Sequence, residues 1–506
     1  MKFIEYVQDQ TSLFPPSLNE LLKQDDICII INDIIEKIGV REIENKYVEE
    51  GNPAYHPRMM VKLLFYGYAR GIRSSRKIAQ ALEENIKFWY LSGRLTPDFR
   101  TISDFRKNHM EEIKTLFKKV VQLCMDMGMV NLGLVAIDGT KIKANASDKQ
   151  TKSKDDLKKD IDILEKEISS FLDEAEKIDA EEDTVYGRNK RGDEIPHELA
   201  QAKSRKERIE KALKKMKKES SEKINMTDND AKTMKGKRQN YMLAYNCQTA
   251  IDSKSDVIIA ADSFSNNSDK SLLKDVVESI RKNTGGNPKK LVADCGYYSS
   301  NNLIYLESEL MNSYIPDARI GKIKQLESGE IKLPEFHKKK FRYDKIRDCY
   351  ICPENKKLIF YKISKSWTKG HVNRTYKAFA KDCLACKNFG VCTEFYKGRT
   401  IEREAMEDLR TRMARKIRTK KGMSIYGKRM HISEMPFGNI KQNLGFREFL
   451  LRSRLKADGE FKLISTIHNI KMIQRFIKKK LKIKSPPIDW IDRLIKIAKK
   501  PAMATI

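Results

Sequence analysis

The sequence lacks any long apolar run, and this absence excludes a class of protein. No stretch approaches the roughly 18–20 apolar residues that a helix needs to cross a bilayer. The first residues, MKFIEYVQDQTSLFPP, are too polar for a secretory signal. We therefore expect a globular protein of the cytoplasm rather than a membrane or exported protein.

Acidic residues are few relative to basic ones. The 506 residues include 100 Lys and Arg but only 70 Asp and Glu, so the formal net charge is +30. A surplus of this size usually indicates a polyanionic partner, and nucleic acid is the preferred candidate because no membrane anchor is expected. The alternative is the generally basic surface of a protein from a lysine-rich proteome.

A disulfide framework is not expected from nine cysteines in a chain without an export signal. Five of the nine lie between Cys349 and Cys392, and they include the pairs Cys349-x2-Cys352 and Cys383-x2-Cys386. Two such pairs suit a tetrahedral structural zinc site, although five candidates leave one cysteine to spare. Reduced thiols without a metal are the alternative.

The length predicts three or four structural units, and the first, residues 1–130, has helical patterning. A single long helix is expected from Thr101 onward. Short helices with tight turns and basic side chains suit a helix-turn-helix-like DNA-binding unit, and an ordinary helical bundle is the alternative. The basic residues concerned are Arg70, Arg73, Arg76, Lys77 and Arg106.

Strand character begins at residue 131. The segment LGLVAIDGTKIKANAS predicts a buried strand that ends at Asp138, and KKLVAD predicts a short strand that ends at Asp294. Between them, YMLAYNCQTAID and VIIAADSFS predict a hairpin, followed by a helix at SLLKDVVESIRK. Leu and Ile at helical spacing in residues 150–223 predict an inserted antiparallel helical hairpin.

The rest of the chain divides into three parts. We expect an irregular cysteine-rich insertion at 313–399, helices from about 400 to 475, and a basic tail at 476–506. The tail is partly amphipathic, and a solvated terminal helix is the expected structure.

Asp138 and Asp294 are candidate metal ligands. Each ends an expected strand and is soon followed by a glycine, Gly139 or Gly296, which would let phosphate or metal approach the backbone. Two-metal phosphoryl chemistry needs carboxylates that converge on ions about 3.5–4 Å apart, and oxygen ligands suit Mg²⁺ or Mn²⁺. Taken singly, an Asp-Gly after a strand is more often an ordinary turn.

Glu434 and Lys441 form a second candidate group. We expect Ser433 to cap a new helix with Pro436 in its first turn. Lys441 lies seven residues after Glu434, about two turns, so one helical face would carry a carboxylate for metal and an ammonium for phosphate. A surface pair without function is the alternative.

Four stretches together resemble the DDE transposases of bacterial insertion sequences, which have a ribonuclease-H-like fold. They follow the order of that family and span nearly the whole chain. The first is HPRMMVKLLFYGYARGIRSSRKIAQAL with TPDFRTISDFRKNH, and the others are VAIDGTKIKANAS, LVADCGYYSSNNL and SEMPFGNIKQNLGFREFLLR.

The resemblance implies roles for particular residues. Asp138, Asp294 and Glu434 would hold two Mg²⁺ or Mn²⁺ ions. The family pattern Tyr-x2-Arg-x3-Glu-x6-Lys fits here with one departure, since four residues separate its arginine and glutamate. The residues that match are Tyr426, Arg429, Glu434 and Lys441 for the pattern, and Tyr245, Asn246 and Gln248 for a YN-x-Q element that would shape the site. The matching zinc set is Cys352, Cys383, Cys386 and Cys392, which omits Cys349 although the CxxC spacing favours it.

The expected fold class is a multi-domain α/β protein. It would combine a helical N-terminal domain with a ribonuclease-H-like mixed-sheet catalytic core at 131–149, 224–312 and 400–475, interrupted by the helical hairpin and the cysteine-rich module. Such an enzyme would act as a nucleoid-associated homodimer on terminal inverted repeats and target DNA, cleaving and then transferring strands. The expected DNA-binding residues are Lys441, Arg429, Tyr426, Arg73, Arg76 and Lys77.

Three alternatives remain at this point. A metal-dependent nuclease without strand transfer would use the same carboxylates. A DNA-binding protein derived from a transposase would keep the fold and the charge but not the activity. A coiled-coil scaffold would explain only residues 150–223.

Overall fold

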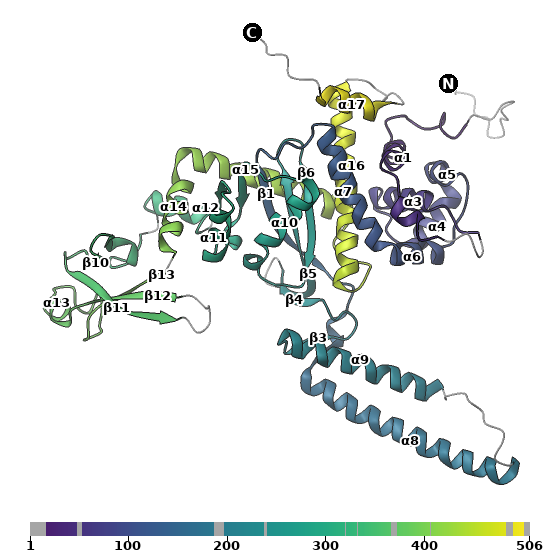
Figure 1. Cartoon of the computed structure of the whole chain (residues 1–506), viewed down its shortest axis with the longest axis horizontal. Helices are drawn as coiled ribbons and strands as arrows, with labels where there is room; N and C mark the ends of the chain where they lie inside the picture. Colours follow the sequence, from purple (N-terminus) through teal and green to yellow (C-terminus); the bar gives the residue numbers. More distant parts are fainter. Residues whose placement is uncertain are drawn as a thin grey trace, which may run out of the picture.

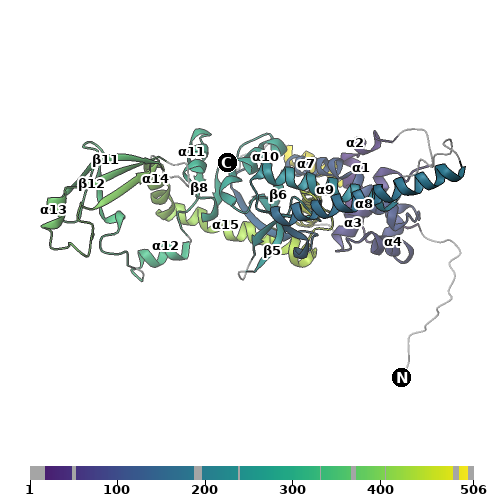
Figure 2. The same cartoon turned by 90° about the horizontal axis from the view of Figure 1, so that it is seen from below.

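The structure is a computed structural model of mixed α/β type with several distinct parts. It describes residues 17–47, 53–186, 197–236, 240–318, 320–330, 332–365, 372–404, 406–481 and 489–499. A helical region lies at one end of the long axis, a mixed sheet lies in the middle and a smaller sheet lies at the other end (Figures 1 and 2). Across these described ranges, no helix is long and apolar enough to cross a membrane.

Seven helices lie in the described part of the N-terminal region, residues 17–47 and 53–126, and local capping explains where several begin. Asp98 caps α6 by accepting a hydrogen bond from the Thr101 backbone N–H, so this helix starts before Thr101. The chain breaks again at His109, so the prediction of one long helix is wrong. The helices are α1 (Ile27–Ile38), α2 (Arg41–Glu44), α3 (Pro57–Ala69), α4 (Ser75–Glu84), α5 (Ile86–Ser92), α6 (Phe99–Asn108) and α7 (Met110–Asp126).

The central sheet has the order β6-β5-β1-β7-β8, with β4 on the same edge of β5 as β6. β5 runs antiparallel to β1 and β6, whereas β7 runs parallel to β1 and β8. The predicted hairpin and the helix after it, α10 (Leu273–Thr284), are present. The strands are β1 (Val135–Lys143), β4 (Lys232–Lys235), β5 (Tyr241–Asp252), β6 (Val257–Phe264), β7 (Leu291–Ala293) and β8 (Ser313–Tyr314).

The expected end of the first strand at Asp138 is wrong. β1 continues to Lys143 because its second half pairs along β5, from Gly139 opposite Gln248 to Lys143 opposite Ala244. Asp138 therefore lies within a strand, while Asp294 follows the end of β7 as predicted.

The predicted helical hairpin is present as α8 (Lys154–Tyr186) and α9 (His197–Glu219), and it projects from the central sheet (Figure 1). Its two chain ends are held together by the antiparallel pair β2 (Thr151–Ser153) and β3 (Lys223–Asn225). The helices bury their own apolar stripe, and Lys206 forms an ion pair with Glu165 across it at 2.7 Å. This stripe includes Leu157, Leu164, Ile209, Ala212 and Met216.

The prediction of an irregular segment at 313–399 is wrong, because most of it folds as an antiparallel sheet of order β13-β12-β11-β10-β9. Its strands are short and rich in lysine, which hides their alternation in the sequence. β13 also extends the sheet beyond residue 399 into a segment expected to be helical. The strands are β9 (Arg342–Asp344), β10 (Cys349–Ile351), β11 (Lys357–Lys365), β12 (Val372–Ala378) and β13 (Thr400–Glu404), accompanied by α12 (Ile320–Glu327) and α13 (Ala380–Leu384).

The helices after this sheet return to the core. Thr419 caps α15 through the Gly422 N–H, so the expectation that a helix begins at Ser433 is wrong. Pro436 lies inside α15 near its C-terminal end, and a π-helical turn at Asn439–Asn443 follows. The helices of this part are α11 (Ser300–Ser308), α14 (Glu407–Arg418), α15 (Lys420–Gly438), α16 (Arg454–Leu481) and α17 (Trp490–Lys499).

One continuous hydrophobic core joins the N-terminal helices, the central sheet, α16 and α17. The expectation of a solvated terminal helix is wrong, because Trp490, Ile491 and Leu494 of α17 are buried. The Trp490 indole N–H also donates to Asp33 Oδ2 of α1 at 2.9 Å. The helical region and the sheet thus share one core rather than forming two.

Glu460 of α16 is the buried polar centre of this core. Its Oε1 accepts a hydrogen bond from the Tyr68 hydroxyl at 2.9 Å, and its Oε2 accepts one from the Leu450 N–H at 2.9 Å. Burial raises the pKa of Glu460 above its usual value, and the Arg106 guanidinium opposes that shift. The carboxyl group therefore connects α3, α16 and the segment after the π-helical turn.

Replacing Glu460 by Ala should destabilise the fold by about 3–5 kcal/mol, because donors and a guanidinium would be left buried without their acceptor. Thermal unfolding followed by circular dichroism measures the effect. Glu278→Ala, at an exposed position of α10, is the matched control and should stay within roughly 0.5 kcal/mol of wild type. Equal midpoints for both variants would contradict the role of Glu460.

Candidate active site

Asp138 and Asp294 lie beside each other because of strand pairing. β1 and β7 are parallel with Ile137 opposite Ala293, so the next residue of each chain segment is an aspartate. Burial raises the pKa of Asp294 above its usual value, and the Asp138 carboxylate raises it further. The structure therefore brings two of the three predicted carboxylates together.

Arg429 of α15 supplies the positive charge at this pair. Its Nη1 lies 3.1 Å from Asp138 Oδ2. Burial lowers the pKa of Arg429, but Tyr426, Asp138 and Asp294 outweigh that effect and raise it above the usual value. The guanidinium carbon also lies 5.7 Å from the centroid of the Tyr426 ring. Arg429 and Tyr426, both expected near phosphate, thus lie at the aspartate pair.

Lys441 reaches the same strand from the π-helical turn. Its ammonium donates to the hydroxyl of Thr140, two residues after Asp138 on the same face of β1. π-helical turns occur often at functional sites. The turn also changes the angle between Glu434 and Lys441, so the expectation of two ordinary helical turns between them is wrong.

Glu434 lies near the C-terminal end of α15 with an exposed side chain. Within the described ranges, no three His, Cys, Asp or Glu side chains lie close enough to hold one metal ion. The structure therefore places Asp138 beside Asp294, but Glu434 does not complete a cluster of three metal ligands with them.

A polar network that the sequence did not reveal lies behind β1. Asp269 Oδ1 accepts hydrogen bonds from Asn246 Nδ2 at 2.7 Å, Gln248 Nε2 at 2.9 Å and Lys141 Nζ at 3.2 Å. The Tyr297 hydroxyl donates to Gln248 Oε1. Asp269 also raises the pKa of Asp294. An aspartate just before a helix usually caps that helix. The position of Asp269 in the sequence therefore gave no indication that it belongs to this network.

The YN-x-Q element therefore divides between two environments. Asn246 and Gln248 hold Asp269 near the aspartate pair, as expected of residues that shape the site. Tyr245 points to the other face, where its hydroxyl donates to Asp228 at 2.8 Å. Gly139 and Gly296 also have internal roles: a Cβ at Gly139 would overlap Gln248 Nε2, and one at Gly296 would lie 2.8 Å from Asp294 Oδ1.

The basic residues of the N-terminal region are not equally accessible. The Arg73 side chain is only 13% exposed; its Nη1 donates to the Glu448 carbonyl at 2.7 Å and its guanidinium lies over the Phe446 ring. Arg106 is buried against Tyr68. Arg76 and Lys77, at the start of α4, are exposed. The structure thus leaves Arg76 and Lys77 on the surface, with the Arg76 guanidinium 5.0 Å from the centroid of the Phe99 ring, but engages Arg73 internally.

A basic cavity of about 560 Å³ lies between α15 and the segments that precede β1, follow β5 and precede β7. Lys428, next to Arg429 in the chain, lines it with His431, and no Asp or Glu is among its lining residues. Three further lysines complete its charge: Lys254, Lys289 and Lys290. Such a cavity favours an anionic group beside the helix that carries Arg429.

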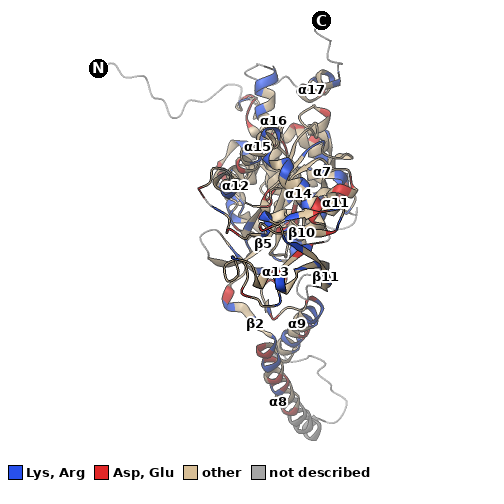
Figure 3. Ribbon diagram, turned by 90° about the vertical axis from the view of Figure 1, so that its left-hand side faces the viewer, with Lys and Arg blue, Asp and Glu red and all other residues tan. Residues whose placement is uncertain are grey.

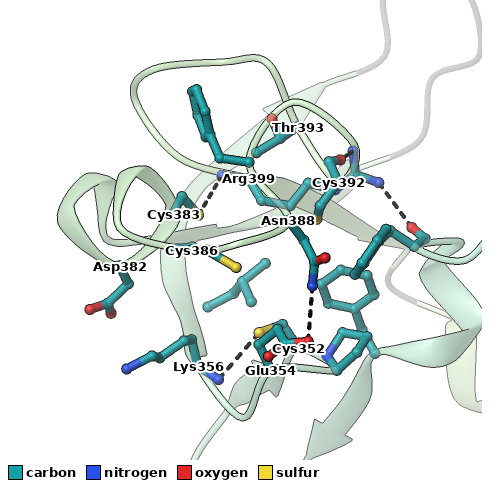
Figure 4. Close-up of a pocket in the computed structure, with 16 residues that line it drawn as sticks. Cys352, Glu354, Lys356, Asp382, Cys383, Cys386, Asn388, Cys392, Thr393 and Arg399 are labelled. Atoms are coloured by element: carbon teal, nitrogen blue, oxygen red, sulfur yellow. Dashed lines mark hydrogen bonds between the residues drawn. The ribbon is translucent and has the colours of Figure 1, made fainter.

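Four of the five clustered cysteines line one pocket: Cys352, Cys383, Cys386 and Cys392 (Figure 4). Backbone N–H groups donate to two of the sulfurs, from Lys356 to Cys352 at 3.2 Å and from Arg399 to Cys383 at 3.4 Å. Cys349 is absent from this pocket because it pairs with Ile359, on the face of the sheet opposite Leu358. Four thiolates are a donor set that a tetrahedral metal such as zinc prefers, but no three of these sulfurs lie close enough together, as the structure places them, to hold one ion.

Comparison with known families gives two matches along the chain. A family described as Transposase domain (DUF772) matches residues 16–108, and a family described as Transposase DDE domain matches residues 351–474. A piggyBac transposase, solved in a synaptic complex with hairpin DNA, aligns at 10% identity over 96% of this chain and 83% of its own. Its TM-score of 0.31 is too low to support any argument. No curated protein matches the sequence.

The first family match covers the N-terminal helices, and the second covers α15 with Arg429, Glu434 and Lys441. Both families are transposase families, and the second is of the DDE type. The two matches, over residues 16–108 and 351–474, together support a DDE transposase of the insertion-sequence type.

Proposed function

We propose that the protein binds the terminal inverted repeats of its own element and catalyses metal-dependent strand cleavage followed by strand transfer. The observation that carries this proposal is the pairing of Asp138 with Asp294 under Arg429, in a chain of a DDE transposase family. The strand order β6-β5-β1-β7-β8, with β5 antiparallel to β1 and β7 parallel to it, supports a ribonuclease-H-like catalytic core.

Asp138 and Asp294 fit Mg²⁺ or Mn²⁺ because carboxylate oxygens are the ligands these ions prefer. Two neighbouring carboxylates repel each other, and a bound cation relieves that repulsion better than one guanidinium. Glu434 is the third ligand in this proposal, on the strength of the family pattern. When bound, the ions supply an activated attacking oxygen and charge stabilisation of the leaving oxygen.

The other residues of the site position DNA. Arg429 and Lys441 approach β1 from α15 and the turn after it, and each presents a cation where a phosphodiester would meet Asp138. Tyr426 packs beside Arg429 and limits its movement. In the proposed complex, Arg76 and Lys77 contact the duplex, and the cavity at Lys428 takes a backbone phosphate.

Two partners complete the proposal. Joining two element ends requires both to be held at once, so we propose a homodimer on DNA in the nucleoid. We also propose that the pocket of Cys352, Cys383, Cys386 and Cys392 holds a structural zinc ion, since backbone N–H donors to sulfur stabilise thiolates. Zinc would then fasten the loop after α13 to the turn after β10.

Substitution of Asp138 or Asp294 by Asn should abolish metal-dependent cleavage of a labelled duplex that carries the element's ends. Loss of groups that merely support metal ligands costs about 10–100-fold, so loss of a ligand should exceed 100-fold. Glu434→Gln should also reduce cleavage by more than 100-fold. Glu278→Gln, at an exposed position of α10, is the control and should cleave at the wild-type rate.

Cleavage that survives in all three site variants would sink this assignment. Wild-type protein that nicks the ends without joining them to target DNA would identify the nuclease alternative instead. Tight, specific end binding without any cleavage would identify the DNA-binding derivative.

Asp269→Asn should slow cleavage by about 10–100-fold without abolishing it, because the amide can still accept a hydrogen bond but loses its charge toward Lys141. Single-turnover cleavage with saturating protein measures the rate. A rate equal to wild type would show that the network behind β1 does not position the aspartate pair.

Zinc analysis by mass spectrometry should find about one ion per chain in wild type, as expected for four thiolates. The double substitution Cys383→Ser and Cys386→Ser should remove it. Cys349→Ala is the matched control and should keep the full zinc content, because Cys349 faces away from the pocket. Equal zinc loss in both variants, or metal-free wild type, would contradict the proposed set.

A further inference from the structure

The antiparallel sheet β13-β12-β11-β10-β9, called the small sheet below, packs one face on its own core and has an outer face on the opposite side. The register pairs Leu358 with Ala378 on the core side, and Ile359 with Lys377 on the other side. A bulge between Phe360 and Lys362 places Lys362 opposite Thr375 on that second side. The outer face includes Lys357, Ile359, Tyr361, Lys362 and Lys377, and Glu402 of β13 lies on the same side, opposite Thr375.

This sheet carries far more exposed apolar area than its size predicts. Tyr361 is 55% exposed and Ile359 is 43% exposed. Among the described residues, 10 of the 22 large hydrophobic side chains that are exposed lie between 341 and 404. Four of these ten side chains belong to β11, and two of the four, Ile359 and Tyr361, lie on the outer face; exposed apolar side chains beside one another are a feature of binding surfaces.

The charge of the same segment restricts the partner. Residues 341–404 include 15 Lys and Arg but 7 Asp and Glu, and Figure 3, viewed from this end of the molecule, shows Lys and Arg on α13 and α14. On the outer face, Lys377 Nζ lies 4.8 Å and Lys362 Nζ 5.8 Å from the centroid of the Tyr361 ring. Neither lysine has a carboxylate partner in the part of the chain that the structure describes.

An exposed aromatic ring between two ammonium groups matches the chemistry of a single nucleic-acid strand. The lysines fit successive phosphates, and when phosphates draw the two ammonium groups away from the Tyr361 ring, the ring offers a stacking surface to a base. A duplex conceals the faces of its bases, so it can use the lysines but not the ring. An acidic protein surface would match the lysines alone.

We propose that the outer face binds unpaired DNA, with a base stacked on Tyr361 and phosphates at Lys362 and Lys377. The proposal rests on the proposed function, because strand cleavage supplies the unpaired end. The small sheet continues through β13 and α14 into α15, which carries Arg429. A strand held on the outer face is therefore connected through the fold to the aspartate pair.

The test measures binding of the full chain to a fluorescent single strand and to the duplex of the same sequence. Tyr361→Ala should weaken single-strand binding by roughly 5- to 150-fold, since a stacked base contributes about 1–3 kcal/mol. Duplex binding should stay within about twofold by the same reasoning. Tyr361→Phe, which keeps the ring, is the matched control and should bind both DNAs as wild type does.

The lysines provide a second, independent measurement. Lys362→Gln with Lys377→Gln should reduce the slope of log affinity against log salt, for the single strand, by about 0.7 per lysine removed. An unchanged slope, or an equal loss of duplex and single-strand affinity in Tyr361→Ala, would overturn the proposal. Self-association of wild type that Tyr361→Ala abolishes, with DNA binding unchanged, would assign the face to a second copy of the chain instead.

Asp138→Asn separates this proposal from the proposed function. It should bind the single strand as wild type does while failing to cleave. If wild type does not cleave but Tyr361→Ala still loses single-strand affinity, the outer face stands and the catalytic proposal fails. If cleavage depends on Asp138 but Tyr361→Ala binds the single strand as wild type does, the catalytic proposal stands and the proposal for the outer face fails.

Discussion

The parallel pairing of β1 with β7 is the constraint on which the site depends. It places Asp138 and Asp294 side by side, where two carboxylates repel each other and where burial already disfavours the charge of Asp294. Arg429 offsets this repulsion from α15. The fold therefore holds two neighbouring carboxylates with a guanidinium beside them, and Asn246 and Gln248 hold Asp269 close enough to raise the pKa of Asp294 further.

Much of this arrangement was predictable from local patterns. Alternating apolar residues gave the β5–β6 hairpin and the short strand before Asp294, and helical spacing gave α8 and α9. The pairing of the two aspartates followed from resemblance to a family. Asp269 was not predictable, because its role depends on Asn246 and Gln248 of another segment, more than 20 residues earlier in the chain.

Two of the errors share a physical cause, which is that partners distant in sequence overrode local preference. Asp138 was expected to end its strand, but pairing with β5 carries β1 on to Lys143. Ser433 is a good capping residue, yet Thr419 caps α15 and the helix runs through it. The strands of the small sheet were missed for a different reason: most are short and rich in lysine, so the alternation of buried and exposed residues is hard to see in the sequence.

The packing of α17 on α1 has a consequence for synthesis of the protein. Trp490 and Asp33 are 457 residues apart in the chain. A ribosome adds about 5–20 residues per second, so α1 waits roughly half a minute to a minute and a half for this partner. During that interval α1 can pack on α3, α5 and α7, but the part of its surface that meets α16 and α17 is uncovered. The core that α1 shares with α17 is therefore completed only after nearly the whole of the intervening chain has been made.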